Sequence, residues 1–271
     1  YKGKRQQEIN YARTAQVQTG AVYCRSPFRR VCCAPVTVSF FCFVNLIHTR
    51  NKQRLPWNAW KITLKNTLQY YENNAVALCA RYEAAPLADL HALLLSLLPK
   101  QERIVELGSG SGRDGAFLVA QGYDWMGIEG ARAMAARSRA LHPDLQGRIL
   151  CADLRHPLPF PDAIFGAVFS FAALMHLESS AVCPVLRETA RILKPGAPLV
   201  ISVPLSRTDV DNTGVDPEGR YFLPWDQDAW CNAISKAGFK VTECTVTNDS
   251  LGRPITWLNL VAQKDAQTAA P

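Results

Sequence analysis

The chain has 271 residues, of which 48% are hydrophobic, enough for one sizeable core or for one domain with an extension. Its net charge of +7 is unevenly spread: residues 1–65 hold 12 of the 30 basic and one of the 23 acidic residues, whereas residues 66–271 hold 18 and 22. The mildly acidic larger part argues against broad nucleic-acid binding. The nine cysteines include no C-x-x-C pair, which argues against structural zinc and favours reduced thiols in a cytoplasmic protein.

Residues 1–62 differ in composition from the rest of the chain. They combine basic residues with an apolar run at 31–47, whose 17 residues are fewer than the roughly 20 that a membrane-spanning helix needs. The first methionine is Met126, so we expect the native protein to begin near residues 62–65. Three interpretations stay open for residues 1–62: an extension that is disordered or not native, a folded accessory element, or an anchor. Only residues 31–47 could associate with a membrane.

From residue 63 onward, apolar strands alternate with amphipathic helices. The pattern predicts helices at residues 66–83, 87–98, from 113 onward, 131–141, 179–193 and 226–237, and strands at 103–107, 123–129, 148–152, 167–171, 198–203, 240–247 and 255–263. Such alternation predicts one α/β domain, here over residues 63–266, with a doubly wound sheet and helices on both faces. Residues 267–271 are expected to form a short tail.

A glycine-rich turn joins the first predicted strand, residues 103–107, to the helix from Arg113. It contains Gly108, Gly110 and Gly112, and glycines let the backbone turn sharply and let a ligand come close. A dinucleotide fingerprint would place its third glycine at Arg113, and the turn lacks the Lys-Ser/Thr pair of a triphosphate-binding loop. The turn therefore indicates a nucleotide-type cofactor that is neither a dinucleotide nor a nucleoside triphosphate.

The string Glu106-Leu-Gly-Ser-Gly-Ser-Gly112 resembles the first motif of class I S-adenosylmethionine (SAM)-dependent methyltransferases. Further matches follow at the expected offsets: Glu129 ends the second strand, Asp153-Leu154 ends the third, and Leu193-Lys-Pro-Gly196 resembles the family's turn before the fifth strand. One position departs from the family pattern, because Gly166 stands where many members carry an aspartate at the start of the fourth strand.

This resemblance implies a mostly parallel, seven-stranded Rossmann-like sheet with a final antiparallel strand, and SAM as the cofactor. Glu129 would accept hydrogen bonds from both ribose hydroxyls, and Asp153 would lie beside the adenine amino group. The expected cofactor-binding residues are Glu106, Gly108, Gly110, Gly112, Glu129, Asp153, Leu154 and Ser170.

The same resemblance places the acceptor beyond the carboxyl ends of the fourth and fifth strands. The candidate acceptor-binding residues are Tyr70, Tyr71, Phe171, Arg207, Arg220 and Tyr221. His176 is the candidate general base, which is needed only if the acceptor must lose a proton. An equally open interpretation is that His176 packs under the fourth strand as a structural residue.

No N-P-P-Y or D-P-P-Y tetrapeptide and no Pro-Cys pair follows the fourth strand, which argues against amino methylation of adenine or glutamine and against cytosine C5 methylation. We therefore expect a methyltransferase that acts on a small-molecule or lipid-like acceptor, with no metal site. One alternative is an RNA or protein methyltransferase that docks through the basic N-terminus. Another is a SAM-binding protein without transfer activity. The sequence leaves the oligomeric state open.

Overall fold

A computed structural model describes residues 59–86 and 88–266, and the predictions made for residues 1–58, the apolar run at 31–47 included, lie outside these ranges. The described residues form a seven-stranded sheet in the order β3-β2-β1-β4-β5-β7-β6. The strands are β1 (Arg103–Leu107), β2 (Asp124–Glu129), β3 (Ile149–Cys151), β4 (Ala167–Phe171), β5 (Pro198–Arg207), β6 (Phe239–Asn248) and β7 (Ile255–Lys264). Strand β7 pairs antiparallel with both β5 and β6, and the pairs among β1 to β5 are parallel. The predicted doubly wound sheet with a final antiparallel strand is confirmed.

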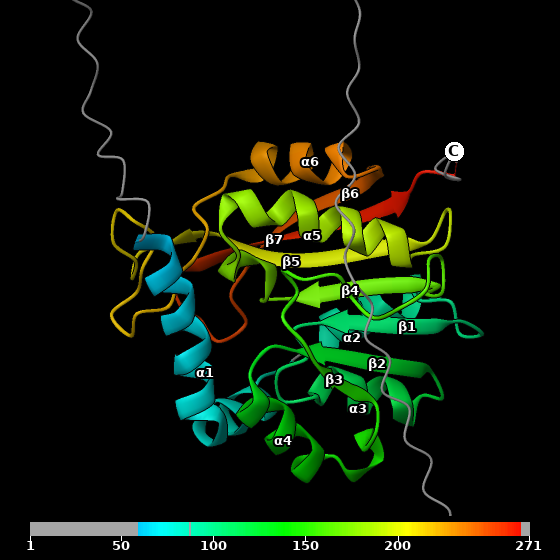
Figure 1. Cartoon of the computed structure of the whole chain (residues 1–271), viewed down its shortest axis with the longest axis horizontal. Coiled ribbons are helices and arrows are strands. Elements are labelled where there is room, and N and C mark those ends of the chain that lie inside the picture. Colours follow the sequence, from blue (N-terminus) through cyan, green and yellow to red (C-terminus); the bar gives the residue numbers. More distant parts are fainter. Residues whose placement is uncertain (1–58, 87, 267–271) are drawn as a thin grey trace, which may run out of the picture. The chain divides into compact units, whose positions relative to one another are not determined.

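Six α-helices and two short 3-10 helices accompany the sheet in the described part of the chain (Figure 1). They are α1 (Ala59–Glu83), α2 (Ala88–Leu97), α3 (Arg113–Ala120), α4 (Arg132–Leu141), η1 (Pro143–Leu145), η2 (Leu174–His176), α5 (Ser179–Ile192) and α6 (Gln227–Lys236). No helix within residues 59–86 and 88–266 combines the length and apolar character needed to cross a membrane. The domain boundaries at residues 62 and 266 stay a prediction.

The two faces of the sheet bury alternate residues, as the period of a strand requires. On β1, Ile104 packs into a core with Leu94 of α2 and Leu118 of α3. Its neighbour Val105 packs on the opposite face, in a core that includes Leu186 of α5 and residues of α6. Strands such as β1 and β4 are apolar along almost their whole length because helices cover both faces of the sheet.

Two predicted element boundaries were wrong by more than one residue. Helix α1 begins at Ala59 rather than at residue 66 or 67, and the Thr67 hydroxyl is not a cap, because it accepts a hydrogen bond from the Tyr221 backbone N–H at 2.9 Å. Strand β5 extends to Arg207 rather than ending at residue 203, because β7 continues to pair with it as far as Ile255. The second difference comes from a strand that is distant in sequence.

Gly166, the departure from the family pattern, is explained by its neighbours. A Cβ atom at this position would lie 2.2 Å from the Cβ of Glu102, so the space of a larger side chain is already filled. The Glu102 carboxylate forms an ion pair with Lys194, at the turn before β5. The entry to β4 is thus held by a glutamate from the turn before β1.

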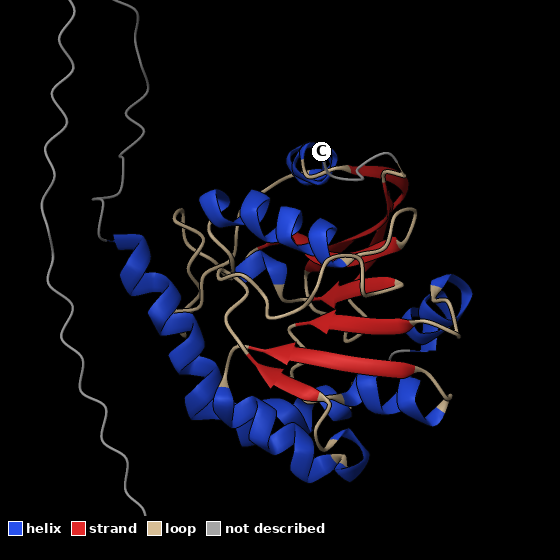
Figure 2. Ribbon diagram, turned by 45° about the vertical axis from the view of Figure 1, so that its right-hand side comes forward, coloured by secondary structure: helices blue, strands red, loops and turns tan. Residues whose placement is uncertain are grey.

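Helix α1 crosses the carboxyl ends of the parallel strands (Figures 1 and 2). It is fixed there by Glu72, whose two carboxylate oxygens accept hydrogen bonds from the backbone N–H groups of Arg132 and Ala133, at 2.6 and 2.8 Å. These N–H groups belong to the first turn of α4, where the peptide dipoles favour a negative charge. Glu72 of α1 therefore caps the N-terminus of α4. This contact holds α1 over the edge of the sheet at which open α/β sheets bind their ligands.

Candidate active site

A cavity of about 760 Å³ lies at the carboxyl ends of the strands. Ligand sites commonly measure about 300–1,000 Å³, so this cavity can hold a cofactor and part of an acceptor. One wall comes from the glycine turn and the ends of β2 and β3, a second from α1 and α2, and a third from β5, the β6–β7 hairpin and the segment before α6. The site thus has a donor half at the glycine turn and an acceptor half at the hairpin.

The glycine turn is shaped by its packing against neighbouring elements. Gly108, Gly110 and Gly112 have φ angles of +78°, +55° and +81°, which residues with a Cβ rarely adopt. A Cβ at Gly108 would lie 2.3 Å from that of Ala173, and a Cβ at Gly112 would lie 2.1 Å from the Ser138 hydroxyl. A Cβ at Gly110 would meet only the Tyr82 ring, at 3.8 Å. Gly108 and Gly110 line the cavity, whereas Gly112 is placed against α4 and lies outside the lining.

Glu129, at the end of β2, fastens this turn. Its carboxylate accepts hydrogen bonds from the Gly110 N–H and the Ala131 N–H, both at 2.8 Å. Burial raises the pKa of Glu129, and these backbone N–H groups oppose the rise by stabilising the charged form. The carboxylate lines the cavity, where its remaining lone pairs could accept ribose hydroxyls.

Glu106 lies behind the turn and is almost fully buried. It accepts a hydrogen bond from the Trp125 indole N–H at 3.1 Å, and burial, together with nearby Asp114, raises its pKa well above the usual value. Next to it, the Ser109 hydroxyl is buried against Gly127 of β2 and has no hydrogen-bond partner among the described residues.

The three other predicted cofactor residues differ in their surroundings. Asp153 and Leu154 line the cavity, but the Asp153 carboxylate is paired with the Arg155 guanidinium. Burial alone would raise the pKa of Asp153, and the hydrogen bonds from Arg155 outweigh that effect and lower it. Ser170 is fully buried, and its hydroxyl donates to the Leu107 carbonyl at 2.8 Å, so the structure does not bring this side chain to the cavity wall.

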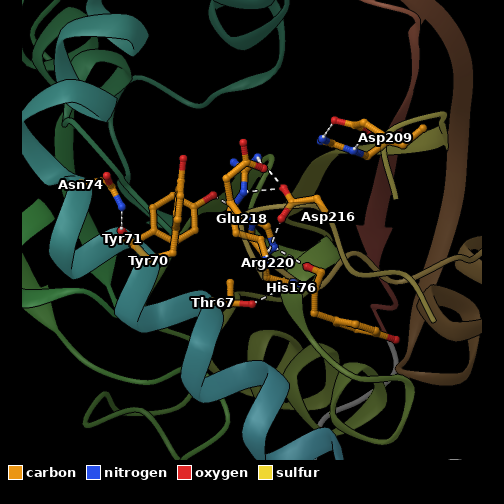
Figure 3. Close-up of polar contacts among 11 residues, drawn as sticks. Thr67, Tyr70, Tyr71, Asn74, His176, Asp209, Asp216, Glu218 and Arg220 are labelled. Carbon is orange, nitrogen blue, oxygen red and sulfur yellow. Dashed lines mark hydrogen bonds and ion pairs between the residues drawn. The ribbon is translucent and has the colours of Figure 1, made fainter. Parts of the chain in front are cut away.

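His176 lies at the end of η2 and forms hydrogen bonds through both ring nitrogens (Figure 3). Its Nδ1 is 2.6 Å from the Tyr221 carbonyl oxygen, which can only accept, so Nδ1 carries the proton. Its Nε2 therefore accepts from the Tyr71 hydroxyl at 2.9 Å. Burial lowers the pKa of His176 to about 4, with Arg220 and Arg207 acting in the same direction. The imidazole is thus neutral near pH 7, and its one lone pair faces Tyr71.

The remaining acceptor candidates surround this pair unevenly. Tyr71, Phe171, Arg207 and Arg220 line the cavity. Tyr70 and Tyr221 lie outside the lining: the Tyr70 ring packs against the Arg220 guanidinium, 4.7 Å from its centroid, and Tyr221 contributes its backbone to His176 and Thr67. The structure brings Tyr70 to the site as support for Arg220.

Several cavity residues were missed by the sequence reasoning. Tyr82 lies eleven positions after Tyr71, so it falls on the same face of α1, and this spacing could have identified it. Asp249 and Arg253 come from the β6–β7 hairpin, where Asp249 accepts hydrogen bonds from Arg253 and from Trp257. Nothing in the local pattern of Asp249 and Arg253 indicated a site, because they reach the cavity only through the antiparallel pairing of β7.

The observed donor half fits SAM: a glycine turn whose middle Cβ space opens towards the cavity, and a carboxylate at the end of β2 that lines it. Residues 105–201 also match the family described as "Methyltransferase domain". The chain carries a class I SAM-dependent methyltransferase domain. Its cofactor is therefore SAM.

Three similar proteins illustrate the range of this family. Bovine 18S rRNA (guanine-N(7))-methyltransferase is 31% identical over 88 residues, which are 32% of this chain and 31% of that protein. The 27-O-demethylrifamycin SV methyltransferase of Amycolatopsis mediterranei is 31% identical over 116 residues, 40% of this chain and 41% of that protein. This chain therefore spans less than half the length of these two relatives.

The third is a solved structure, 1,6-didemethyltoxoflavin-N1-methyltransferase of Burkholderia thailandensis with 1,6-didemethyltoxoflavin and S-adenosylhomocysteine bound. It has a TM-score of 0.62 at 17% identity and covers 80% of this chain and 98% of that protein. At this identity the likeness shows the fold alone. Acceptors named for the relatives differ in class, so they do not define the acceptor of this chain.

Proposed function

We propose that the protein transfers the methyl group of SAM to a small-molecule acceptor. The observation that carries this proposal is a continuous cavity that runs from the glycine turn to the β6–β7 hairpin, with aromatic and polar side chains in its acceptor half. The mildly acidic charge of residues 66–271 supports a small acceptor over a nucleic acid.

Methyl transfer is an in-line displacement for which bound SAM supplies an electrophilic methyl group on a sulfonium. The protein's residues hold donor and acceptor in line and exclude water. In our proposal Glu129, Gly108 and Gly110 hold the nucleoside part, and α1 closes the cavity above it through Tyr71 and Tyr82. Asp153 and Leu154 would line the adenine end, with Asp153 oriented by Arg155.

For His176 we propose a positioning role rather than that of a direct base. Its lone pair is occupied by the Tyr71 hydroxyl, and a pKa of about 4 makes it a weak acceptor for a phenol or alcohol proton. We expect His176→Ala to lower turnover while leaving SAM affinity nearly unchanged. If His176 only positions Tyr71, the variant His176→Gln, which can still accept a hydrogen bond from Tyr71, should recover the turnover lost in His176→Ala, and the pH profile of turnover should not shift. If His176 is a base, the pH profile should lose one titration in both variants.

Calorimetric titration with S-adenosylhomocysteine and with NAD tests the donor half. We expect binding of the former only, and NAD binding alone would overturn the proposal. A structure with S-adenosylhomocysteine then shows which side chains surround the sulfur, and transfer from methyl-labelled SAM across an acceptor panel tests the reaction. Quantitative SAM binding with no methyl loss across that panel would indicate a binding protein without transfer activity.

The similarity to an rRNA methyltransferase and the basic N-terminal segment favour a second candidate, transfer to RNA. Contacts with phosphates make binding strongly salt-dependent. Under this alternative, methyl transfer to an RNA acceptor falls at high salt and on deletion of residues 1–58. Transfer that is indifferent to both would leave the small-molecule acceptor as the better explanation.

A further inference from the structure

Four arginines from distant parts of the chain meet at the acceptor end of the cavity. We call them the arginine cluster: Arg81 of α1, Arg207 at the end of β5, Arg220 of the segment before α6, and Arg253 of the β6–β7 hairpin. All four line the main cavity, and all four also line a smaller adjoining cavity of about 270 Å³. The donor half differs, because its lining combines the carboxylates of Glu106 and Glu129 with two arginines, Arg113 and Arg155.

Two members of the cluster, Arg220 and Arg253, are oriented by buried carboxylates. Arg220 pairs with Asp216, whose side chain is 0% exposed and also accepts from the Arg220 backbone N–H (Figure 3). Arg253 pairs with Asp249, which is 3% exposed and also accepts from Trp257. A guanidinium has five N–H donors in a fixed plane, so each pair leaves donors over.

The flat faces of two guanidinium groups are held as well. Arg207 pairs with Asp209 and stacks on the Phe222 ring, 3.8 Å from its centroid. Arg220 lies over the Tyr70 ring at 4.7 Å and is also near Phe222. Because the flat faces of these guanidinium groups are stacked and one edge of each is paired with a carboxylate, only the unpaired N–H edges are left to bind a ligand in the cavity. Such pre-oriented edges suit planar, bidentate oxyanions.

Arg81 differs from the other three because the described part of the chain gives it no carboxylate partner. It is exposed on α1, and its guanidinium is 5.6 Å from the Tyr82 ring centroid. The two acids that line only the smaller cavity, Asp209 and Glu218, are each about half exposed. A negative ligand is therefore expected to approach from the main cavity, where the carboxylate beside the cluster, Asp249, is already paired with Arg253.

We propose that the arginine cluster binds an anionic group, a carboxylate or a phosphate, on the methyl acceptor. This inference rests on the proposed function, because it names the chemistry of the acceptor for that same cavity. The aromatic side chains Phe222 and Trp257, next to the cluster, would contact the apolar part of such an acceptor. Arg81 supplies the charge that is not already neutralised.

The test uses the full chain saturated with S-adenosylhomocysteine and pairs of probes that differ in charge but little in size. Benzoate is compared with benzamide, and phenyl phosphate with benzyl alcohol, by ligand-observed NMR titration at low salt. We expect the anion of at least one pair to bind about tenfold more tightly than its neutral partner, since charge-assisted hydrogen bonds are the stronger ones. Preference for benzoate or for phenyl phosphate distinguishes a carboxylate from a phosphate acceptor.

Variants then assign the selectivity to the cluster. Arg81→Gln should reduce anion affinity about fivefold or more, and Arg81→Lys should recover part of it, because lysine keeps the charge. Arg187→Gln is the matched control, since Arg187 is also exposed on a helix but lies on α5, outside the cavity lining.

Equal binding of charged and neutral probes, or anion affinity unchanged in Arg81→Gln, would overturn the inference. Both outcomes leave the proposed function standing if S-adenosylhomocysteine still binds. Loss of that binding in the unmodified protein would instead overturn the proposed function.

Discussion

The donor and acceptor halves of the cavity are built in different ways. The donor half is made by consecutive residues around one turn, where Gly108 to Gly112 link β1 to α3 and are fastened by Glu129 at the end of the next strand in the sheet. The acceptor half is assembled from four distant segments, and its contacts, such as Tyr71 to His176 and Thr67 to Tyr221, span 105 and 154 positions. Local geometry thus fixes the donor, whereas the acceptor depends on tertiary packing that can vary between relatives.

The largest expected effect is on the packing of the donor half. Gly112→Ala places a Cβ 2.1 Å from the Ser138 hydroxyl at a φ of +81°, and should lower the free energy of unfolding by about 3 kcal/mol. Gly147→Ala is the matched control: it has a φ of +78° but nothing within 4 Å of the added Cβ, so only the backbone cost of about 1–2 kcal/mol applies. Denaturant unfolding measures both, and equal losses would show that packing against α4 contributes nothing.

The second prediction concerns cofactor binding. Glu129→Gln should weaken S-adenosylhomocysteine binding about 100-fold, or about 2.7 kcal/mol, because the charged acceptor of the Gly110 N–H and of the expected ribose contact is lost. Glu72→Gln is the control, since Glu72 also accepts two backbone N–H groups but lies outside the cavity lining. Calorimetry should find its affinity within about threefold of the unmodified protein. Similar losses in the two variants would mean that Glu129 acts only through the fold.

The difference between the donor and acceptor halves also decides how much of each half could be predicted from the sequence. Strands β1 and β4 were predicted to the residue, because each is a short apolar run next to a glycine: Gly108 follows β1 and Gly166 precedes β4. Glu129 was found because a family motif has a fixed offset along the chain. Arg253 and Asp249 were not found, since their place at the site depends on the register between β6 and β7. The role of Ser170 was expected from its position at the end of β4, yet its hydroxyl is bonded to Leu107.

The third prediction concerns the acceptor half and the pH dependence of the free energy of unfolding that His176 causes. The pKa of His176 is about 4 in the folded protein and about 6.5 when unfolded, so between these values the unfolded state binds more protons. Stability from this group is therefore full above about pH 6.5 and is lost as the pH falls towards 4, by about 2 kcal/mol for a half-buried ring. The free energy of unfolding of His176→Gln should lack this part of the pH dependence. A difference between the two proteins that stays constant from pH 7 to 4 would contradict it.

The smallest expected effect separates the two halves most directly. Tyr71→Phe removes the hydroxyl that His176 accepts from, and should lower the free energy of unfolding by about 1 kcal/mol. Because the donor half is fastened by Glu129 and not by Tyr71, S-adenosylhomocysteine affinity should change less than about threefold. Tyr70→Phe is the matched control, since its contact with Arg220 is made by the ring, which phenylalanine keeps. If Tyr71→Phe instead weakens the cofactor as much as Glu129→Gln does, the cavity works as one unit and its division into a donor and an acceptor half is wrong.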